Sequence, residues 1–324
     1  MSAEPKLVHR RFRFSLRTLL IVVTIASVAF GWLGSKVRQA QRQREAVEAI
    51  EKLGGAVLYD FQVDSDGQPA DEQQPAPIWL QKLVTIDFLA NVSSVDLSYS
   101  TPPHKVEVPL EPLSDSGLAC LQGLTNLRSV SLDYSNVTDA GLSRLGGLTQ
   151  LKRLSLTYTN VTGAGMETIG GFVQLKHLHL TATDVTDSGL QYLQGLTQLK
   201  TLDLAETKIT DAGLLHIRGK TNLESLSLAH TQVTDSGLAN LQGLSKLEIL
   251  SLYHTQVTTE GIIHLRGLTQ LRDLSLGCTF VGDGGLLDLR GLVELEHLGL
   301  YDTLVTNQGC QKLQKVLPNL KITR

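Results

Sequence analysis

The chain has 324 residues, enough for one large domain or two small ones. Hydrophobic residues at 42% and charged residues at 19% exclude a wholly disordered chain and a membrane protein with many spans. Ten Lys and Arg against four Glu give residues 1–52 a charge of +6, and the net charge of −3 then leaves −9 for residues 53–324. An acidic surface repels phosphate backbones, so we expect no nucleic-acid partner.

Residues 18–35 are 18 residues without a charge. As a helix they would be about 27 Å long, close to the thickness of a bilayer's hydrocarbon core. Five Lys and Arg precede this stretch, four follow within ten residues, and Glu45, Glu48 and Glu51 come soon after. The pattern predicts a basic cytoplasmic tail at residues 1–17 and a transmembrane helix at 18–35 that acts as a signal anchor. The protein would be a single-pass membrane protein with its remainder on the outer, periplasmic or extracellular, side.

A cleaved signal peptide is the alternative interpretation of this segment. Ser27, Val28 and Ala29 are the small residues that a signal peptidase accepts. However, the apolar stretch continues through Phe30 and Trp32, and so exceeds the usual apolar region of a signal peptide. Cleavage, and a reversed topology with the rest of the chain in the cytoplasm, both stay open.

Residues 36–91 are predicted to form a helical stalk, a linker and an N-terminal cap. Apolar side chains recur at helical spacing in residues 36–55, which end in Gly54 and Gly55, a stop signal for a helix. A short strand is expected at Ala56–Phe61, followed by an exposed loop rich in Pro, Gln and Asp. The apolar residues expected to cap the next domain are Trp79, Leu80, Leu83, Ile86 and Phe88.

Residues 127–318 contain eight repeats of 24 residues in register, with the pattern LxxLxLxxTxVTDxGLxxLxGLTx. We number each repeat from its first leucine, so that Leu127 is position 1. This period and the LxxLxL core are typical of leucine-rich repeats. The fold class predicted is therefore an α/β leucine-rich-repeat solenoid, a horseshoe with a parallel concave sheet and short outer helices, preceded by one N-terminal transmembrane helix.

Some positions of the repeat are polar or small in most repeats, and we interpret them as structural. Position 9 is Thr in seven repeats and Ser135 in the first, and we expect its hydroxyl to bond a loop carbonyl in its own or the adjacent coil. Thr at position 12 and Asp at position 13, as in Thr210 and Asp211, predict a cap and a favourable charge at the start of the outer helix. Gly at position 15, as in Gly213, lets neighbouring coils approach.

The ends of the repeat array are irregular. Residues 92–126 predict a degenerate first repeat with an insertion at residues 101–112 that contains Pro102, Pro103, Pro109 and Pro112. The insertion is interpreted as a tolerated surface loop, with a partner-binding flap as the alternative. Residues 319–324 predict a C-terminal half strand.

The repeat resembles the cysteine-containing class of leucine-rich repeat found in F-box/leucine-rich-repeat proteins, with Thr at the usual Cys position. Together with RFSLRTLLIVVTIASVAFGWLG, it also resembles uncharacterised bacterial membrane-anchored leucine-rich-repeat proteins. The resemblance covers residues 92–324 and implies the fold. Recruitment of ubiquitin-ligase substrates is not carried over, because residues 1–91 predict an anchor in place of a helical adaptor domain.

Side chains between and after the strand leucines are expected on the concave face, where five of the nine histidines fall. Aromatic and charged side chains in a concave array suit protein or glycan binding. The candidate ligand-binding residues are Tyr134, Tyr158, His177, His179, Asp203, Glu206, His230, Tyr253 and His254.

Catalysis and metal binding are weaker interpretations of the same face. His179, Asp203 and Ser227 share one column, but Asp203 lies in the middle, where a catalytic triad needs histidine. The pairs His177 with His179 and His230 with His254 could hold a metal, but exposed polar side chains explain them equally well. We predict no enzyme, no metal and no cofactor.

The three cysteines lack CxxC spacing and predict neither a disulfide framework nor a zinc cluster. The predicted function is a membrane-anchored binding module for a protein or glycan, and the alternative is a cell-envelope spacer without a specific ligand.

Overall fold

The computed structural model describes residues 16–70, 85–98 and 112–324. Most of the predicted basic tail lies outside these ranges. So do Trp79, Leu80 and Leu83 of the predicted cap, and all of the proline-rich insertion except Pro112.

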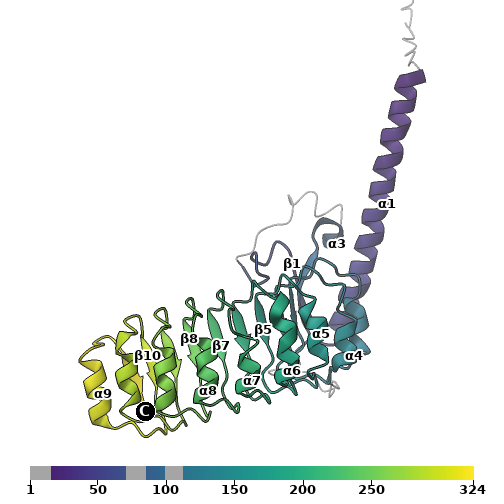
Figure 1. Cartoon of the computed structure of the whole chain (residues 1–324). Helices are drawn as coiled ribbons and strands as arrows, with labels where there is room; N and C mark the ends of the chain where they lie inside the picture. Colours follow the sequence, from purple (N-terminus) through teal and green to yellow (C-terminus); the bar gives the residue numbers. More distant parts are fainter. Residues whose placement is uncertain (1–15, 71–84, 99–111) are drawn as a thin grey trace, which may run out of the picture.

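The predicted membrane segment and stalk form one continuous helix, α1 (Leu16–Lys52), which projects from one end of the molecule (Figure 1). Its apolar first half is exposed, and an 18-residue window there has a mean hydropathy of 2.0. By length and composition, this half could cross a membrane. Its second half packs against the rest of the chain through Ala40, Gln43, Val47 and Ile50, and the helix ends before Gly54, which has φ +80°.

A small cap joins α1 to the repeats. Strand β1 (Ala56–Tyr59), two residues shorter than predicted, pairs antiparallel with β2 (Val92–Asp96), and the short helix α3 (Ile86–Leu89) lies between them in sequence. The buried Gln43 side chain donates to the carbonyl of Ala90 (2.9 Å) and accepts from the backbone N–H of Val92 (3.1 Å). Because both amide atoms have backbone partners, α1 is fixed to the start of the sheet.

In the described part of the chain, the sheet has 11 strands in sequence order, and from β2 onward every pair is parallel. Consecutive strands from β3 on pair residues 24 apart, so one repeat makes one coil. Strands β3 to β11 are Ser129–Ser131, Arg153–Ser155, His177–His179, Thr201–Asp203, Ser225–Ser227, Ile249–Ser251, Asp273–Ser275, His297–Gly299 and Lys321–Thr323.

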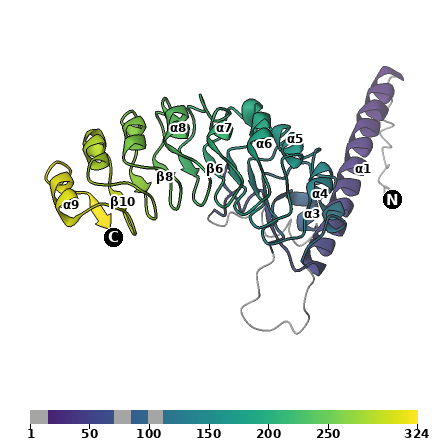
Figure 2. The ribbon, with the colours of Figure 1, turned by 60° about the horizontal axis from the view of Figure 1, so that its bottom comes forward.

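Short helices cover the outside of the curve and the strands line its inside (Figure 2). The α-helices α4 to α9 are Asp139–Ser143, Gly165–Gly170, Asp187–Leu190, Asp211–Leu214, Asp235–Leu238 and Asn307–Gln314. The 3₁₀-helices η1 to η5 are Gly117–Leu121, Gln191–Gly195, Ala239–Leu241, Glu260–Leu265 and Gly285–Gly291.

Leucines at positions 1, 4 and 6 build one continuous core, as in Leu199, Leu202 and Leu204, which are at most 1% exposed. No repeat buries these side chains alone, because each coil packs its leucines against the coils on either side. The structure confirms the predicted solenoid, with its parallel concave sheet and outer helices.

The Asp at position 13 lies in the first turn of the outer helix, as expected, and has a second role. Thr at position 12 caps its own helix, since Thr210 Oγ1 accepts from the N–H of Ala212. The Asp also reaches the next coil: Asp187 accepts from both the N–H (2.8 Å) and the hydroxyl (2.6 Å) of Thr210. Gly213 is needed there, because a Cβ on it would lie 2.4 Å from Asp187 Oδ1. The Thr-Asp pair therefore joins coils as well as starting helices.

Candidate functional site

The position-8 residue of every repeat has a left-handed backbone, with φ between 52° and 57°. A side-chain hydroxyl closes this turn: Thr159 Oγ1 donates to the carbonyl of Leu156 (2.7 Å), across the left-handed Tyr158. The hydroxyl at position 9 therefore bonds within its own coil. We call these eight residues the left-handed column: Tyr134, Tyr158, Ala182, Glu206, His230, His254, Cys278 and Asp302.

A second bond connects seven of the eight turns to the next coil. The N–H of Glu206 donates to the carbonyl of Ala229 (2.8 Å), and the same bond recurs from Tyr134 to Cys278. A left-handed conformation costs a residue with a side chain about 1 kcal/mol, and glycine would avoid this cost. Yet none of the eight residues is glycine. Five of the nine candidate ligand-binding residues lie in this column.

The first three candidates in the left-handed column form a connected group. The rings of Tyr134 and Tyr158 stack, with centroids 5.0 Å apart and an interplanar angle of 10°. The Tyr158 hydroxyl donates to the carboxylate of Glu206, with oxygen separations of 3.3 and 3.4 Å. This carboxylate raises the pKa of Tyr158, so the hydroxyl keeps its proton at neutral pH. The group crosses the coil of Ala182 and presents an exposed aromatic surface.

Three further candidates lie on the strands, at neighbouring register positions. His177 and His179 are on β5, and Asp203 on β6 pairs with His179. Burial, and then the charge of Arg153, lower the pKa of His177 to about 4, and burial also lowers the pKa of His179. Both imidazoles are therefore neutral at pH 7, and His177 Nδ1 is 3.0 Å from the hydroxyl of Thr201. These groups offer neutral hydrogen-bonding sites to a ligand.

The last three candidates form a cluster of rings. His230 and His254 have centroids 4.6 Å apart, and Tyr253 meets His230 edge-on at 5.3 Å. Gly277 in the following coil leaves room for Tyr253, because a Cβ there would lie 2.9 Å from the tyrosine ring. The two histidines are exposed, so their ring edges are accessible to a ligand.

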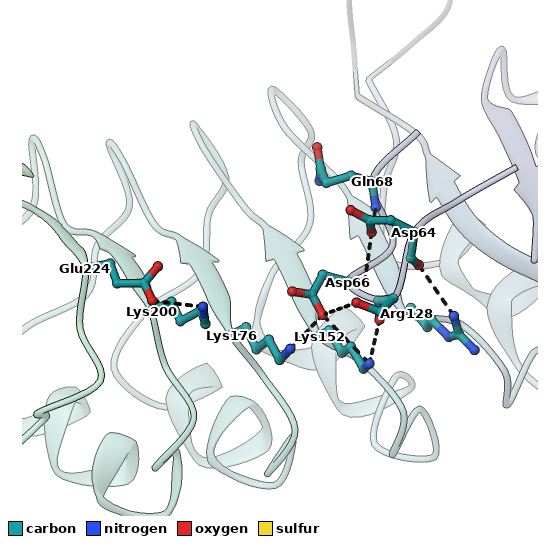
Figure 3. Close-up of polar contacts among 9 residues, drawn as sticks. Asp64, Asp66, Gln68, Arg128, Lys152, Lys176, Lys200 and Glu224 are labelled. Atoms are coloured by element: carbon teal, nitrogen blue, oxygen red, sulfur yellow. Dashed lines mark hydrogen bonds and ion pairs between the residues drawn. The ribbon is translucent and has the colours of Figure 1, made fainter. Parts of the chain in front are cut away.

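A basic column, missed by the reasoning from sequence, lies at position 2 of the first repeats: Arg128, Lys152, Lys176 and Lys200. An acidic turn at residues 64–68 lies against it (Figure 3). Lys176 Nζ contacts Asp66 Oδ1 at 2.6 Å, and Lys152 Nζ donates to the carbonyl of Ser65 at 2.5 Å. Lys200 instead pairs with Glu224 of the next coil (2.8 Å).

The acidic turn is preorganised by its own residues. The Asp64 carboxylate accepts from the N–H groups of Asp66 (2.8 Å) and Gln68 (2.9 Å), and Gly67 has φ +84°. The Lys176 hydrogen bond lowers the pKa of Asp66, so the contact is charged at neutral pH. A Cβ on Gly67 would lie 3.0 Å from the Cβ of Ser129 on β3, so the turn covers part of the N-terminal end of the concave face.

The signal for this contact is visible in the sequence only as two separate facts. Four basic residues recur 24 apart from Arg128 to Lys200, and the sequence DSDG at residues 64–67 favours a turn. Charge complementarity suggests that they meet, but nothing local to either segment gives the geometry.

The structure also places the residues of the two weaker interpretations, catalysis and metal binding. His179, Asp203 and Ser227 do lie on adjacent strands, with Asp203 between the other two. Within residues 16–70, 85–98 and 112–324, no group of three or more His, Cys, Asp or Glu side chains is placed to hold a metal ion. The three cysteines are free thiols.

Comparison with known proteins agrees with this geometry. A family model described as Leucine Rich repeat matches residues 123–146, 175–193, 195–217 and 219–241. With one coil for each 24-residue repeat, these matches define the class: the chain is a leucine-rich-repeat protein.

Similar solved structures include two internalins from Listeria monocytogenes. The internalin inlF is 23% identical, with 63% of this chain and 69% of that chain covered and a TM-score of 0.47. The internalin C2 (inlC2) is 31% identical, with 56% and 73% covered and a TM-score of 0.45. No curated protein matches the chain.

Proposed function

We propose that this protein is a membrane-anchored, non-catalytic binding module that recognises another protein through its concave face. The left-handed column carries the proposal. Eight consecutive repeats hold a strained turn without using glycine, and six of its side chains are exposed. Strained positions that keep side chains are typical of sites where the side chain is used.

The C-terminal part of the face is the better docking surface, because the acidic turn covers part of the N-terminal end. Beside the ring cluster of His230, Tyr253 and His254, four apolar side chains are 46–66% exposed, namely Ile249, Phe280, Tyr301 and Leu304. Exposed apolar and aromatic groups next to hydrogen-bonding rings favour a protein partner over a glycan. A cell-envelope spacer without a ligand would not require them.

The first half of α1 is the proposed anchor. It is exposed, apolar and unbroken, and basic residues flank it on both sides. The N-terminus would then be cytoplasmic and the repeats periplasmic or extracellular. Protease treatment of intact cells tests this orientation: digestion of the repeats supports it, and full protection overturns it.

The binding test is a crosslinked pulldown of the intact protein from its own membranes. The triple variant His230→Ala/Tyr253→Ala/His254→Ala should lose at least tenfold of the captured partner, since clustered rings at an interface contribute about 1–2 kcal/mol each. The matched control, His216→Ala/His264→Ala, removes two histidines of the convex side and should capture the partner normally. Equal capture by all three proteins would refute concave-face binding, and absence of any defined partner would favour the spacer.

A further inference from the structure

A pocket lies where α1 first meets the repeats. The helix supplies Ser35, Arg38, Gln39 and Arg42 to its wall, and the first coil supplies Gly123 and Asn126. No Asp or Glu is among the described residues that line it, so the two arginines make the pocket positively charged.

Neither lining arginine is neutralised within the described part of the chain. Arg38 and Arg42 make no ion pair there, whereas Arg44, on the same helix, pairs with Glu48 (3.1 Å). The Arg38 guanidinium folds back along the helix, since its Nη1 is 3.9 Å from a Cβ placed on Gly34. It therefore points toward the apolar half of α1.

The pocket wall is held rigid by one asparagine. Asn91 Oδ1 accepts from Gln39 Nε2 of the helix (3.0 Å) and from Asn126 Nδ2 of the first coil (3.1 Å). Asn91 itself donates from Nδ2 to Asp60 (3.0 Å). The two sides of the pocket are thus tied together without using the arginines, which stay available to a ligand.

The position of the pocket relative to the bilayer follows from the proposed anchor. If the hydrocarbon core ends near Ser35, Arg38 lies about 4.5 Å and Arg42 about 10 Å beyond it along the helix. The headgroup layer of a bilayer is about 5–7 Å thick on each side. Arginine side chains lean toward the N-terminus of a helix, so both guanidinium groups reach this layer.

We propose that this pocket binds a phosphate group, with Arg38 and Arg42 as its ligands, and that an anionic phospholipid headgroup supplies it. Planar guanidinium groups form paired hydrogen bonds with phosphate oxygens, and the polar side chains of Ser35 and Gln39 provide further donors. The lipid source rests on the proposed membrane anchoring. A bound headgroup would fix the repeats against the membrane surface.

The test compares two double variants of the full-length protein in nanodiscs of equal phosphatidylglycerol and phosphatidylcholine. Arg38→Gln/Arg42→Gln removes the pocket's charges, and Lys36→Gln/Arg44→Gln removes the same number at the same average depth. Native mass spectrometry of released protein measures which lipid is retained. We expect wild type to prefer phosphatidylglycerol. The first variant should lose about 30-fold of that preference, because it removes the charge-assisted hydrogen bonds to the phosphate. The second variant should lose less than about threefold, because Lys36 and Arg44 do not line the pocket. Equal losses in both variants would mean general surface attraction and would overturn the pocket.

Inorganic phosphate distinguishes the source of the group. In detergent, without a bilayer, phosphate should raise the melting temperature of wild type and of Lys36→Gln/Arg44→Gln but not of Arg38→Gln/Arg42→Gln. Phosphate protection without lipid preference would support the pocket with a soluble ligand. No protection and no lipid preference would overturn it. Carbonate extraction of cell membranes tests anchoring alone, so release of the protein there would refute the anchor and leave the phosphate result standing.

Discussion

The two halves of the concave face share one backbone but differ in what lies on them. In the N-terminal half, β3 to β6, position 2 is basic in every repeat, from Arg128 to Lys200, and the acidic turn lies on it. In the C-terminal half, β7 to β10, position 2 is acidic except at Arg272, and the rings of His230, Tyr253 and His254 are uncovered. The charge of the position-2 side chains therefore determines which half of the concave face the acidic turn covers and which half a partner can reach.

The largest effect is expected in the core beneath both halves. We call the N-terminal half, β3 to β6, the covered half and the C-terminal half, β7 to β10, the open half. Leu178→Ala under the covered half and Leu250→Ala under the open half should each lower the free energy of unfolding by about 2–5 kcal/mol, because both side chains are at most 1% exposed. Chemical denaturation of the full chain measures this. A much smaller loss at Leu250 than at Leu178 would show that the open half is loosely packed, so that the two halves would not be equivalent in their cores.

Gly277→Ala should disrupt the open half specifically. The new Cβ would meet the ring of Tyr253 at 2.9 Å and the carbonyl of Tyr301 at 3.1 Å, so we expect a loss of about 1–3 kcal/mol and reduced partner capture. Gly299→Ala is the control, since its Cβ would be 3.5 Å or more from its neighbours and should change stability by less than about 0.5 kcal/mol. Thermal unfolding compares the two variants.

The covered half should lose stability in acid through His177. Its pKa is about 4 when folded, against an ordinary value of 6.5, so the folded state favours the neutral imidazole. The stability that the neutral His177 contributes is fully present above pH 6.5. As the pH falls toward 4, the free energy of unfolding should decrease by about 1–3 kcal/mol. His177→Asn should therefore lose less stability than wild type between pH 6.5 and 4 in denaturation curves. Identical pH dependence in the two proteins would contradict the burial of this histidine.

The smallest effect is expected at the acidic turn itself. Asp66→Asn weakens the contact with Lys176 and should cost less than about 1 kcal/mol, because the pair is partly solvated. Hydrogen exchange in residues 64–68 should nevertheless become several-fold faster. Asp184→Asn, which breaks the more exposed pair with Lys208 (2.7 Å), is the control and should leave that exchange unchanged. Unchanged exchange in Asp66→Asn would show that the turn is held without this ion pair.

The fold was predictable from the sequence because every coil repeats the same short pattern of residues. The spacing of Leu199, Leu202 and Leu204 predicts a strand with a buried face, and the 24-residue period predicts which residues pair on neighbouring strands. The nine candidate residues follow from the same counting, and the structure places them on the concave strands or in the left-handed column and position 7 beside it. That they bind a ligand stays a prediction.

The amino-acid sequence by itself determined the solenoid, its register and its apolar N-terminal segment, because these depend on periodicity and on length. Only the tertiary structure decided three further features. Tyr158 and His230 carry no local signal for a left-handed backbone, which the hydroxyl bond and the next coil impose. Asp187 bonds a threonine 23 residues away, and Asp66 meets a lysine 110 residues away. Contacts of this range depend on how the coils stack and on where α1 and the cap position the acidic turn. A short stretch of residues determines neither of these two arrangements.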